Sequence, residues 1–345
     1  MALEKFRLPG TDIITYKNAF GALPIQRRNF SDAIRIIRRA FDGGMTYVDT
    51  ARAYSDSEEK IGAAFENIPR DSYFLATKTA ATTPEAFWQD LHTSLKNLKT
   101  DYIDVYQLHQ AKACYREGDG SGLYECLSEA QKQGKIRYKS ITAHKIGVAE
   151  EIAASGLYAT LQFPFSYLAS ERDLALVEKC KKNGVGFIAM KALSGGLITD
   201  SRAAFAFINQ FDNVLPIWGV QKEEEIEEWL SYIENPPAFT KEIEAFIEND
   251  RLEFGKDFCR GCGYCMPCPQ GIVINQCARI SQMIRMAPGE VWLNEHWQAE
   301  MKKTETCLNC RLCTKKCPYK LDIPTLLKKN HDDYFEVLNG ERGAK

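Results

Sequence analysis

Two groups of four cysteines lie in the C-terminal quarter of this 345-residue chain, and their spacing suits metal binding. The second group is followed by Pro318 and fits the iron–sulfur spacing C-x2-C-x2-C-x3-C-P. Two-residue gaps allow three thiolates from one turn to surround an iron–sulfur cluster, while a fourth thiolate comes from elsewhere in the chain. The two groups are Cys259, Cys262, Cys265 and Cys268, and then Cys307, Cys310, Cys313 and Cys317.

The fourth cysteine of each group is expected to bind the cluster of the other group, as in two-cluster ferredoxins. The chain is therefore predicted to hold two 4Fe-4S clusters. One set of ligands is Cys259, Cys262, Cys265 and Cys317, and the other is Cys307, Cys310, Cys313 and Cys268. The first group has one residue fewer before its proline, and the spacer between the groups is long and helical in pattern. In this the module resembles the α-helical ferredoxin domains of succinate-dehydrogenase-type subunits.

Structural zinc and disulfides are the alternative uses of these thiols. Zinc sites favour two CxxC pairs separated by a spacer, and two triplets at three-residue steps fit that pattern poorly. Disulfides suit short secreted chains, and the N-terminus MALEKFRLPG contains no apolar segment of the signal-peptide kind. Cys277 is expected to be a core thiol or a spare ligand, and Cys114, Cys126 and Cys180 are expected to be small core residues.

Four proton-handling residues stand at the ends of strand-like runs in the first third of the chain. Asp49 follows MTYV, with Tyr54 just beyond it, while Lys78 ends YFLATK and His109 follows IDVYQL. The Lys78 ammonium is expected to lower the pKa of Tyr54 toward the working range, and Asp49 to keep Lys78 charged. His109 would hydrogen-bond the substrate oxygen. Such a site protonates the oxyanion that forms when hydride reaches a carbonyl, or acts in reverse on an alcohol.

The elements that position these residues alternate between strand-like runs and amphipathic helical patterns from about residue 18 to 230. Several runs are apolar almost throughout, as parallel strands covered on both faces should be. Eight such units predict a (β/α)8 TIM barrel, whereas the competing doubly wound sheet lacks a GxGxxG after its first strand. One helix is expected at 31–44, capped by Ser31. The strand-like runs are 18–23, 45–49, 73–78, 103–108, 137–142, 160–163, 185–190 and 213–219.

The alternation stops near residue 237, so we expect a barrel over 1–237 and a small α-helical iron–sulfur domain over 238–345. The composition is 45% hydrophobic and 26% charged with a formal net charge of −2, which gives no reason to expect a nucleic-acid partner. No apolar run approaches bilayer length, so membrane insertion is not expected. A soluble, cytoplasmic and anaerobic setting is the expectation, because exposed iron–sulfur clusters suffer in air.

The residues around the proton-handling groups resemble those of the aldo-keto reductase family. VDTARAYSDSEEKIG is similar to the family signature, and LATK and DYIDVYQLH resemble its lysine and histidine segments. The resemblance covers residues 1 to about 232, and the cysteine domain is similar to that of a subgroup of these reductases. The catalytic tetrad that it implies is Asp49, Tyr54, Lys78 and His109. The family also implies a nicotinamide dinucleotide extended across the C-terminal face of the barrel.

The resemblance implies NAD(P)H as the cofactor, and a departure from the family pattern favours NADH over NADPH. Family members often carry basic residues for the adenosine 2′-phosphate after the eighth strand. Here the loop reads GVQKEEEIEEWL, and Glu225 stands about where an arginine is common. A carboxylate beside a phosphate dianion is repulsive. The cofactor-binding residues are expected to be Thr142 and Gln162 near the carboxamide, together with Gly219 and Lys222.

Hydride chemistry moves two electrons, whereas each cluster passes one, and three hypotheses connect the two modules. The clusters could relay electrons between a ferredoxin-like redox partner and the barrel. The barrel could instead be an NAD(H)-dependent reductase with a structural or oxygen-sensing helical domain. In the third hypothesis the chain is an electron-transfer protein whose barrel has lost nicotinamide binding and serves as a scaffold. The complete tetrad favours an oxidoreductase acting on a small-molecule carbonyl or alcohol.

Overall fold

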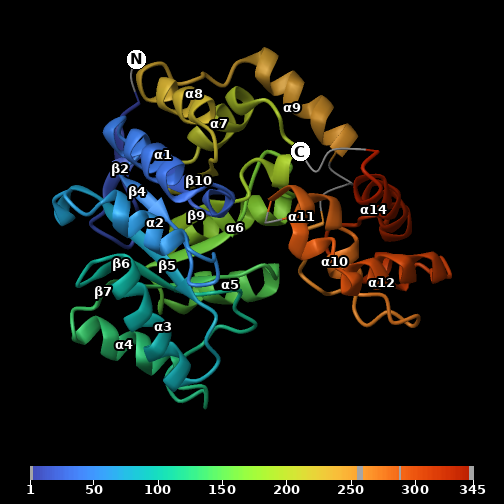
Figure 1. Cartoon of the computed structure of the whole chain (residues 1–345), viewed down its shortest axis with the longest axis horizontal. Coiled ribbons are helices and arrows are strands. Elements are labelled where there is room, and N and C mark those ends of the chain that lie inside the picture. Colours follow the sequence, from blue (N-terminus) through green and yellow to red (C-terminus); the bar gives the residue numbers. More distant parts are fainter. Residues whose placement is uncertain (1–2, 255–258, 287–288, 342–345) are drawn as a thin grey trace. The chain divides into compact units, whose positions relative to one another are not determined.

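The chain divides into two compact units in its computed structural model (Figure 1). The first unit comprises Met1–Ala192 and Arg202–Phe239, and the second comprises Leu193–Ser201 and Thr240–Lys345. The short segment Leu193–Ser201, expected within the barrel, is therefore part of the second unit. Among the described residues, no helix combines the length and apolarity needed to cross a membrane. The structure describes residues 3–254, 259–286 and 289–341.

Eight parallel strands close into a barrel in the first unit, which confirms the predicted fold class. The strands follow one another around the barrel in chain order, and the last one, β10, pairs with the first, β3. Most strand residues are buried, as the apolar runs predicted. The strands are β3 Ala19–Gly21, β4 Tyr47–Asp49, β5 Phe74–Thr79, β6 Ile103–Leu108, β7 Ile136–Thr142, β8 Thr160–Pro164, β9 Gly186–Met190 and β10 Val214–Gly219.

The register of three neighbouring strands brings polar side chains to one layer of the barrel interior. Asp49 on β4 pairs with Ala76 on β5, so Lys78, two residues further along β5, faces the same side as Ala76. Lys78 in turn pairs with Gln107 on β6. Side chains of one parity point inward in such a barrel. The register therefore places Asp49, Lys78 and Gln107 together near the C-terminal ends of their strands.

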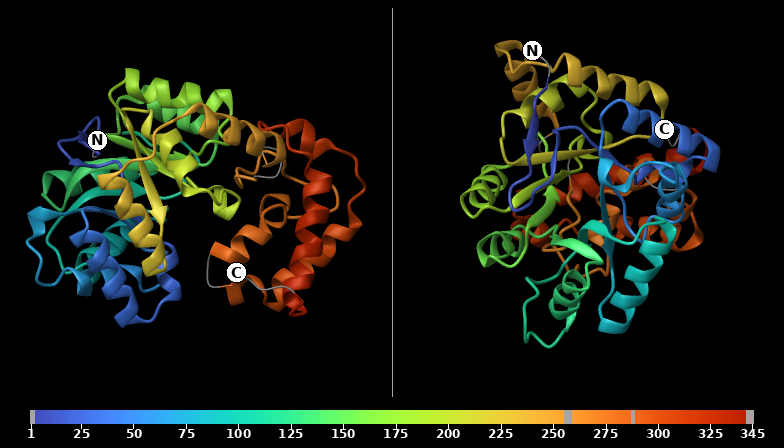
Figure 2. Two further views of the ribbon diagram at one scale, coloured as in Figure 1. Left: turned by 90° about the horizontal axis from the view of Figure 1, so that it is seen from above. Right: turned by 90° about the vertical axis from the view of Figure 1, so that its left-hand side faces the viewer.

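Helices follow the strands of the first unit, as the alternating pattern predicted (Figure 2). The cap of α1 differs from the expectation. The helix begins at Phe30, so Asn29 and not Ser31 is the N-cap. The Asn29 side-chain oxygen accepts a hydrogen bond from the Asp32 N–H at 2.8 Å. The helices are α1 Phe30–Asp42, α2 Ser57–Ala64, α3 Pro84–Asn97, α4 Leu123–Lys132, α5 Ile146–Ser155, α6 Glu171–Lys182, α7 Ser201–Asn209 and α8 Glu223–Glu234.

A short antiparallel hairpin, β1 Lys5–Arg7 and β2 Ile14–Tyr16, precedes the barrel and was not predicted. Leu8 and Ile13, beside its turn, are fully buried in one hydrophobic cluster with residues of the barrel strands. Gly10 has a positive φ of 73°, and a Cβ there would lie 2.4 Å from the Ala159 carbonyl oxygen, which directly precedes β8. The hairpin thus covers the N-terminal end of the barrel, opposite to the strand ends that carry the polar residues.

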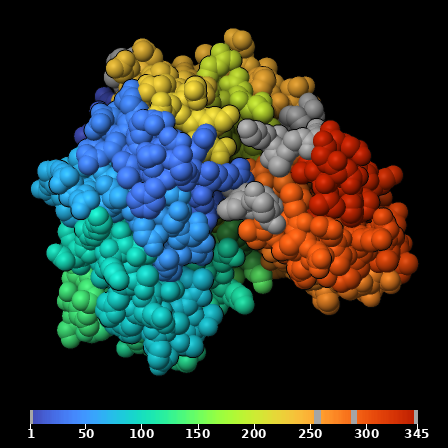
Figure 3. Space-filling model, viewed as in Figure 1, coloured from blue at the N-terminus to red at the C-terminus, as the bar shows by residue number. Residues whose placement is uncertain are grey.

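The second unit is helical, as predicted, and α14 contacts four of its other helices (Figure 1). Most atoms of this unit are coloured orange to red in the space-filling view (Figure 3). Contacts join α14 to α10, α11, α12 and α13. Asn330 of α14 is buried, donates to the Ala278 carbonyl at 3.3 Å and accepts from the Ser281 N–H at 3.1 Å. The helices are α9 Lys241–Phe254, α10 Ile274–Cys277, α11 Ile280–Met286, α12 Glu295–Lys303, α13 Leu312–Lys316 and α14 Ile323–Leu338.

Candidate active site and metal centres

A buried ion pair lies at the C-terminal ends of β4 and β5. The Lys78 ammonium donates to Asp49 Oδ1 at 2.5 Å and to the Thr50 carbonyl at 2.6 Å. Only 1% of Lys78 and 2% of Asp49 is exposed. Burying an ammonium and a carboxylate costs several kcal/mol each, and their mutual pairing and further hydrogen bonds must offset this cost. The two residues are therefore held in one geometry by their burial.

The second oxygen of Asp49 accepts two side-chain amides. Gln107 Nε2 donates to Asp49 Oδ2 at 3.1 Å, and Gln162 Nε2 donates to the same oxygen at 3.0 Å. Gln107 was not predicted as a site residue, although it lies two residues before His109, near the C-terminal end of its strand, where other site residues were expected. The amide of Gln162, expected near a nicotinamide carboxamide, here orients Asp49. Both carboxylate oxygens thus have donors, which fixes the lysine partner.

Tyr54 lies beside this pair, on the loop between β4 and α2. The Lys78 ammonium is 5.2 Å from the centre of the Tyr54 ring, and the rings of Tyr54 and His109 meet edge to face with centroids 6.0 Å apart. Burial raises the pKa of Tyr54 above its usual value, and the ammonium of Lys78 lowers it by less. The expected net fall in this pKa is therefore wrong for the chain alone, because desolvation of the phenolate outweighs the lysine.

His109 follows β6 and is kept neutral by its surroundings. Its backbone N–H continues the sheet by donating to the Thr79 carbonyl at 2.8 Å. Burial, followed by the nearby Lys78 ammonium, lowers the pKa of His109 to about 3. A neutral imidazole carries one N–H donor and one acceptor nitrogen. His109 can therefore donate a hydrogen bond to a substrate oxygen without changing its charge at neutral pH.

A second buried polar group supports the loop that carries Tyr54. Glu58, in the first turn of α2, is 1% exposed and accepts from Thr77 Oγ1 at 2.8 Å and Ser94 Oγ at 2.7 Å. Arg52, on the loop itself, forms an ion pair with the same carboxylate. The Arg52 N–H also donates to the Lys78 carbonyl at 2.9 Å. The loop is thus bound to β5 on both sides of Tyr54, a role that the sequence analysis did not assign.

The remaining predicted cofactor residues lie at the ends of β7 and β10. Thr142 Oγ1 accepts from the Gln110 N–H at 2.7 Å and is fully buried. Gly219 ends β10, and Lys222 directly precedes α8. The Glu225 carboxylate accepts from the N–H groups of Gln221 at 2.8 Å and Lys222 at 3.1 Å. The start of α8 is therefore already occupied by a carboxylate of the chain, where an anion would otherwise bind.

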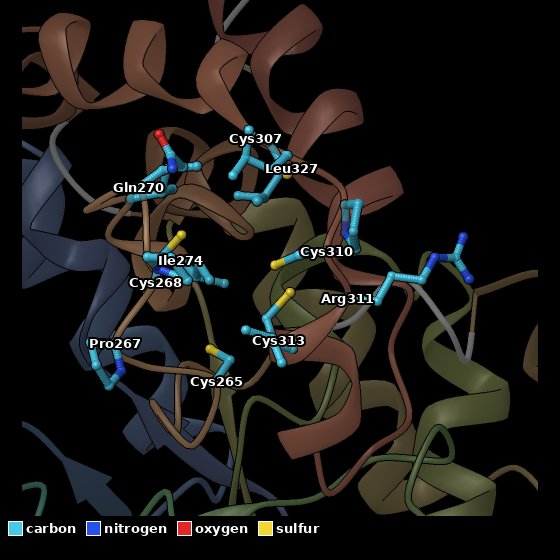
Figure 4. A pocket seen from close by; sticks show the side chains of 15 residues that line it. Cys265, Pro267, Cys268, Gln270, Ile274, Cys307, Cys310, Arg311, Cys313 and Leu327 are labelled. Carbon is cyan, nitrogen blue, oxygen red and sulfur yellow. The ribbon is translucent and has the colours of Figure 1, made fainter.

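The eight clustered cysteines line two cavities in the second unit. The smaller cavity includes four thiols of the first predicted set, Cys259, Cys262, Cys265 and Cys317. The other includes Cys268, Cys307, Cys310 and Cys313, with Cys265 at the border between the two. Figure 4 shows the sulfur atoms of Cys310 and Cys313 directed into this second cavity, while the side chain of Arg311 extends away from it.

The two cysteine loops have the same backbone pattern at matching positions. In the first loop Gly261 and Gly263 have positive φ angles of 70° and 78°, and in the second Asn309 and Arg311 have 52° and 58°. Each pair lies two and four residues after the first cysteine of its loop. Loop residues in the left-handed conformation can direct backbone N–H groups inward and form a concave anion site, an arrangement common around iron–sulfur clusters. Both loops therefore fit an anionic cluster rather than a bare turn.

Arg279 adds a positive charge to the first thiol set. A Cβ on Gly261 would lie 2.7 Å from the Arg279 guanidinium carbon, so the two residues are packed directly. The thiolates of Cys259 and Cys262 raise the pKa of Arg279, although burial lowers it by more. Arg279 lies in the turn between α10 and α11 and was not predicted as a site residue, because a single arginine there carries no spacing signal of its own.

The other cysteines are buried apart from these cavities. Cys277 has no exposed surface, and its thiol lies 3.8 Å from the Glu300 carbonyl oxygen. Cys114, Cys126 and Cys180 are buried in the first unit, as expected of core residues. In the described ranges, no three His, Cys, Asp or Glu side chains converge as they would on a single metal ion. The thiols surround two larger spaces instead.

Comparison with sequence families matches both units. A profile described as "Aldo/keto reductase family" covers residues 18–206, and a profile described as "4Fe-4S dicluster domain" covers residues 258–322. Aldo-keto reductase YhdN of Bacillus subtilis (strain 168) is 31% identical over 180 residues, which cover 48% of this chain and 54% of that protein. L-galactose dehydrogenase of Arabidopsis thaliana is 26% identical over 183 residues, covering 49% and 57%. The chain thus spans little more than half of these relatives.

Solved structures share the barrel fold. The holo form of aldo-keto reductase AKR11C1 from Bacillus halodurans aligns with a TM-score of 0.64 and 19% identity, covering 72% of this chain and 96% of that one. An aldo-keto reductase from Klebsiella pneumoniae in complex with NADPH gives a TM-score of 0.62 and 19% identity, covering 72% and 95%. At these identities the likeness shows the fold of the first unit.

Proposed function

The chain belongs to the aldo/keto reductase family, and we propose that it reduces a carbonyl group of a small molecule at Tyr54. The observation that carries this proposal is the convergence of three groups on one phenol: the Lys78 ammonium 5.2 Å from its ring, the His109 ring against its edge, and Asp49 fixing the lysine. These groups can give a proton to an oxygen at which negative charge develops.

The proton of Tyr54 is the one that the carbonyl oxygen receives. Because burial raises the pKa of Tyr54, the phenol is protonated at neutral pH and ready to donate. Lys78 stabilises the phenolate that remains, and neutral His109 donates a hydrogen bond that positions the substrate oxygen. Alcohol oxidation, the reverse reaction, needs the phenolate at the start. We therefore expect reduction to dominate near neutral pH and oxidation to become faster at alkaline pH.

The residues proposed to hold the cofactors are those that the family resemblance implies and the eight clustered cysteines. When bound, a nicotinamide supplies a hydride, and iron–sulfur clusters supply single electrons. Thr142 and Gln162 would lie near the carboxamide, with Gly219 and Lys222 near the adenosine end. The Glu225 carboxylate accepts from the two N–H groups just before α8 and repels a 2′-phosphate, which favours NADH over NADPH.

The eight thiols in the two cavities would hold two 4Fe-4S clusters in the crosswise arrangement. The paired cavities and the repeated loop backbone support this ligand assignment. Reduced thiols suit a cytoplasmic, low-oxygen setting. A ferredoxin-like protein that exchanges electrons with the second unit is part of the proposal.

Tyr54→Phe tests the proton donor. Removing the phenolic oxygen is expected to lower kcat/KM for reduction of a test aldehyde such as 4-nitrobenzaldehyde by about 10²–10⁴-fold, with the iron content unchanged. Tyr138→Phe is the matched control, since Tyr138 lies on β7 and its hydroxyl accepts from the Asp12 N–H at 3.0 Å, away from Lys78. Equal, small losses in both variants would show that another group supplies the proton.

Glu225→Gln tests the cofactor preference. Calorimetric titration of the wild-type protein is expected to show tighter binding of NADH than of NADPH, because only NADPH brings the 2′-phosphate close to this carboxylate. The variant should bind NADPH more tightly while NADH binding changes little. If neither dinucleotide binds the wild-type protein, the nicotinamide part of the proposal is wrong.

A further inference from the structure

We propose that the surface around Cys310, formed by Leu308, Arg311, Leu312, Lys315 and Lys316, docks an acidic one-electron carrier protein. The inference rests on the proposed binding of iron–sulfur clusters by the second unit and goes beyond it, because it assigns the place and the chemistry of electron exchange. Each encounter moves one electron: the carrier is oxidised by one electron, and the iron–sulfur set of Cys310 is reduced by one. No proton or other reactant is required.

The two thiol sets differ in their access to solvent. In the first set Cys259 and Cys265 are buried and Cys262 and Cys317 are half-buried. In the second set Cys310 is exposed. Electron exchange between proteins needs a short path from one redox centre to the other. The second set is therefore the one that an external protein can approach.

Two large apolar side chains flank Cys310 at the surface. Leu308 is 67% exposed and Leu312 is 47% exposed, and both lie within two residues of the exposed thiol. They are among the eight large hydrophobic residues that are exposed in the described part of the chain. Leucines adjacent to an exposed ligand of a redox centre provide the apolar contact that a transient protein interface uses at its middle.

Positive charge surrounds these leucines and sets the chemistry of the partner. From Thr306 to Leu321 the chain has four basic residues and no acidic one. Arg311 is 58% exposed at its side chain, and Lys315 and Lys316 are exposed at the end of α13. Asp322 lies 3.7 Å from Arg311 and offsets part of its charge, but the lysines have no carboxylate on their own segment.

Charge complementarity selects an acidic occupant. A protein with net negative charge is steered to a basic surface, and the rate of such encounters falls steeply as salt is added. A second copy of this chain that paired through the same surface would present the same positive charges and would be repelled. Small acidic iron–sulfur or flavin carriers combine negative charge with one-electron chemistry, and they are the class of partner that fits.

The test uses the full-length protein with its iron–sulfur clusters and an acidic two-cluster bacterial ferredoxin as the probe. Binding is measured by calorimetry, and cluster reduction by stopped-flow absorbance, at low and high NaCl. The surface variant is Lys315→Glu with Lys316→Glu, and a charge-neutral version replaces both by Gln. The matched control is Lys181→Glu with Lys182→Glu, an adjacent exposed pair at the end of α6 in the first unit. Iron content and circular dichroism verify each variant.

The surface variant is expected to bind the ferredoxin about tenfold more weakly or worse, and to be reduced correspondingly slowly. The Gln version should show a smaller loss of the same sign, and the control should stay within about twofold of the wild-type protein. Equal binding by surface and control variants, or binding that salt does not weaken, would overturn the docking surface. Reduced methyl viologen, a small cation that needs no docking surface, distinguishes failure of the docking surface from failure of the proposed iron–sulfur function. If methyl viologen also reduces no cluster, the proposed iron–sulfur function is wrong.

Discussion

The pair of Asp49 and Lys78 combines burial with complete hydrogen bonding. Asp49 accepts from Lys78, Gln107 and Gln162, and Lys78 also donates to a backbone carbonyl. Two amides on the oxygen opposite the lysine leave the carboxylate no other orientation. The pair therefore fixes the ammonium beside Tyr54 before any ligand arrives, which is the preorganisation that electrostatic catalysis requires.

Lys78→Met should destabilise the first unit, because it leaves the Asp49 carboxylate buried without its counter-charge. A loss of about 3–5 kcal/mol is expected, measured as a fall in the melting temperature of the barrel by scanning calorimetry. Adding Asp49→Asn should restore part of the loss, since the remaining partner is then neutral. Lys181→Met, which breaks the exposed pair with Asp212, is the control and should leave the melting temperature almost unchanged. Comparable losses at both positions would contradict the argument.

His109 should not titrate in the physiological range. Its pKa of about 3 in the folded chain lies below the ordinary 6.5, so the unfolded state binds the proton first as the pH falls. The stabilisation that this neutral imidazole allows is complete above about pH 6.5 and is lost progressively toward pH 3. The pH profile of kcat/KM for reduction is therefore expected to lack an inflection near 6.5. Such an inflection in the wild-type protein, absent from His109→Asn, would show that the imidazole is charged during turnover.

At the scale of elements, the sequence predicted the strands and the residues at their ends better than the contacts between them. The apolar runs give β4, β5 and β6, and so place Asp49, Lys78 and His109 correctly. The hydrogen bond that the Gln107 amide donates to Asp49 depends on the register between neighbouring strands, which the periodicity of apolar residues does not specify. The N-terminal hairpin was missed because its strands have three residues each and its fully buried apolar residues, Leu8 and Ile13, lie beside its turn and outside the strands.

In the cysteine loops, too, the sequence predicted the positions of the residues but not their backbone conformation or contacts. Cysteine spacing predicted two thiol sets, but not that Asn309 and Arg311 adopt the left-handed backbone that Gly261 and Gly263 have in the other loop. Non-glycine residues with positive φ angles are uncommon, and a sequence pattern seldom indicates which residues adopt them. Arg279 also escaped prediction, because its approach to the first set depends on the packing of α10 and α11 around Gly261.

Arg279→Gln should lower the reduction potential of one cluster. A nearby positive charge stabilises the more negative, reduced form of a cluster, and the substitution removes this charge together with the hydrogen bonds that the guanidinium donates to Gln276 Oε1. A fall on the order of 50–100 mV is expected, equal to about 1–2 kcal/mol of Coulomb energy for a one-electron couple. Redox titration followed by electron paramagnetic resonance measures it. Arg285→Gln, whose guanidinium pairs with Asp333 on α14, is the control. A shift of both clusters, or of neither, would contradict the position assigned to Arg279.

At the scale of the whole molecule, the second unit is expected to depend on iron more than the first unit does. Its core cluster includes Cys259, Cys265 and Cys313 among the buried residues, so three thiols of the two sets are also core side chains. The first unit has a closed barrel with its own core and no clustered thiols. Metal binding and folding are coupled where ligands form part of a small core.

Removal of iron should therefore unfold the second unit and leave the barrel folded. Calorimetry is expected to show two transitions for the loaded protein and only the barrel transition after treatment with a chelator and an oxidant. The segment Leu193–Ser201 provides a second readout. It belongs to the second unit although it lies between β9 and α7 in the sequence. Because residues 193–201 contain no Lys or Arg, a protease of broad specificity is used in place of trypsin. It should cut the iron-free protein both beyond Phe239 and within 193–201, while the loaded protein resists at both places. Cleavage beyond Phe239 alone would show that the barrel itself holds this segment and that its order does not depend on iron.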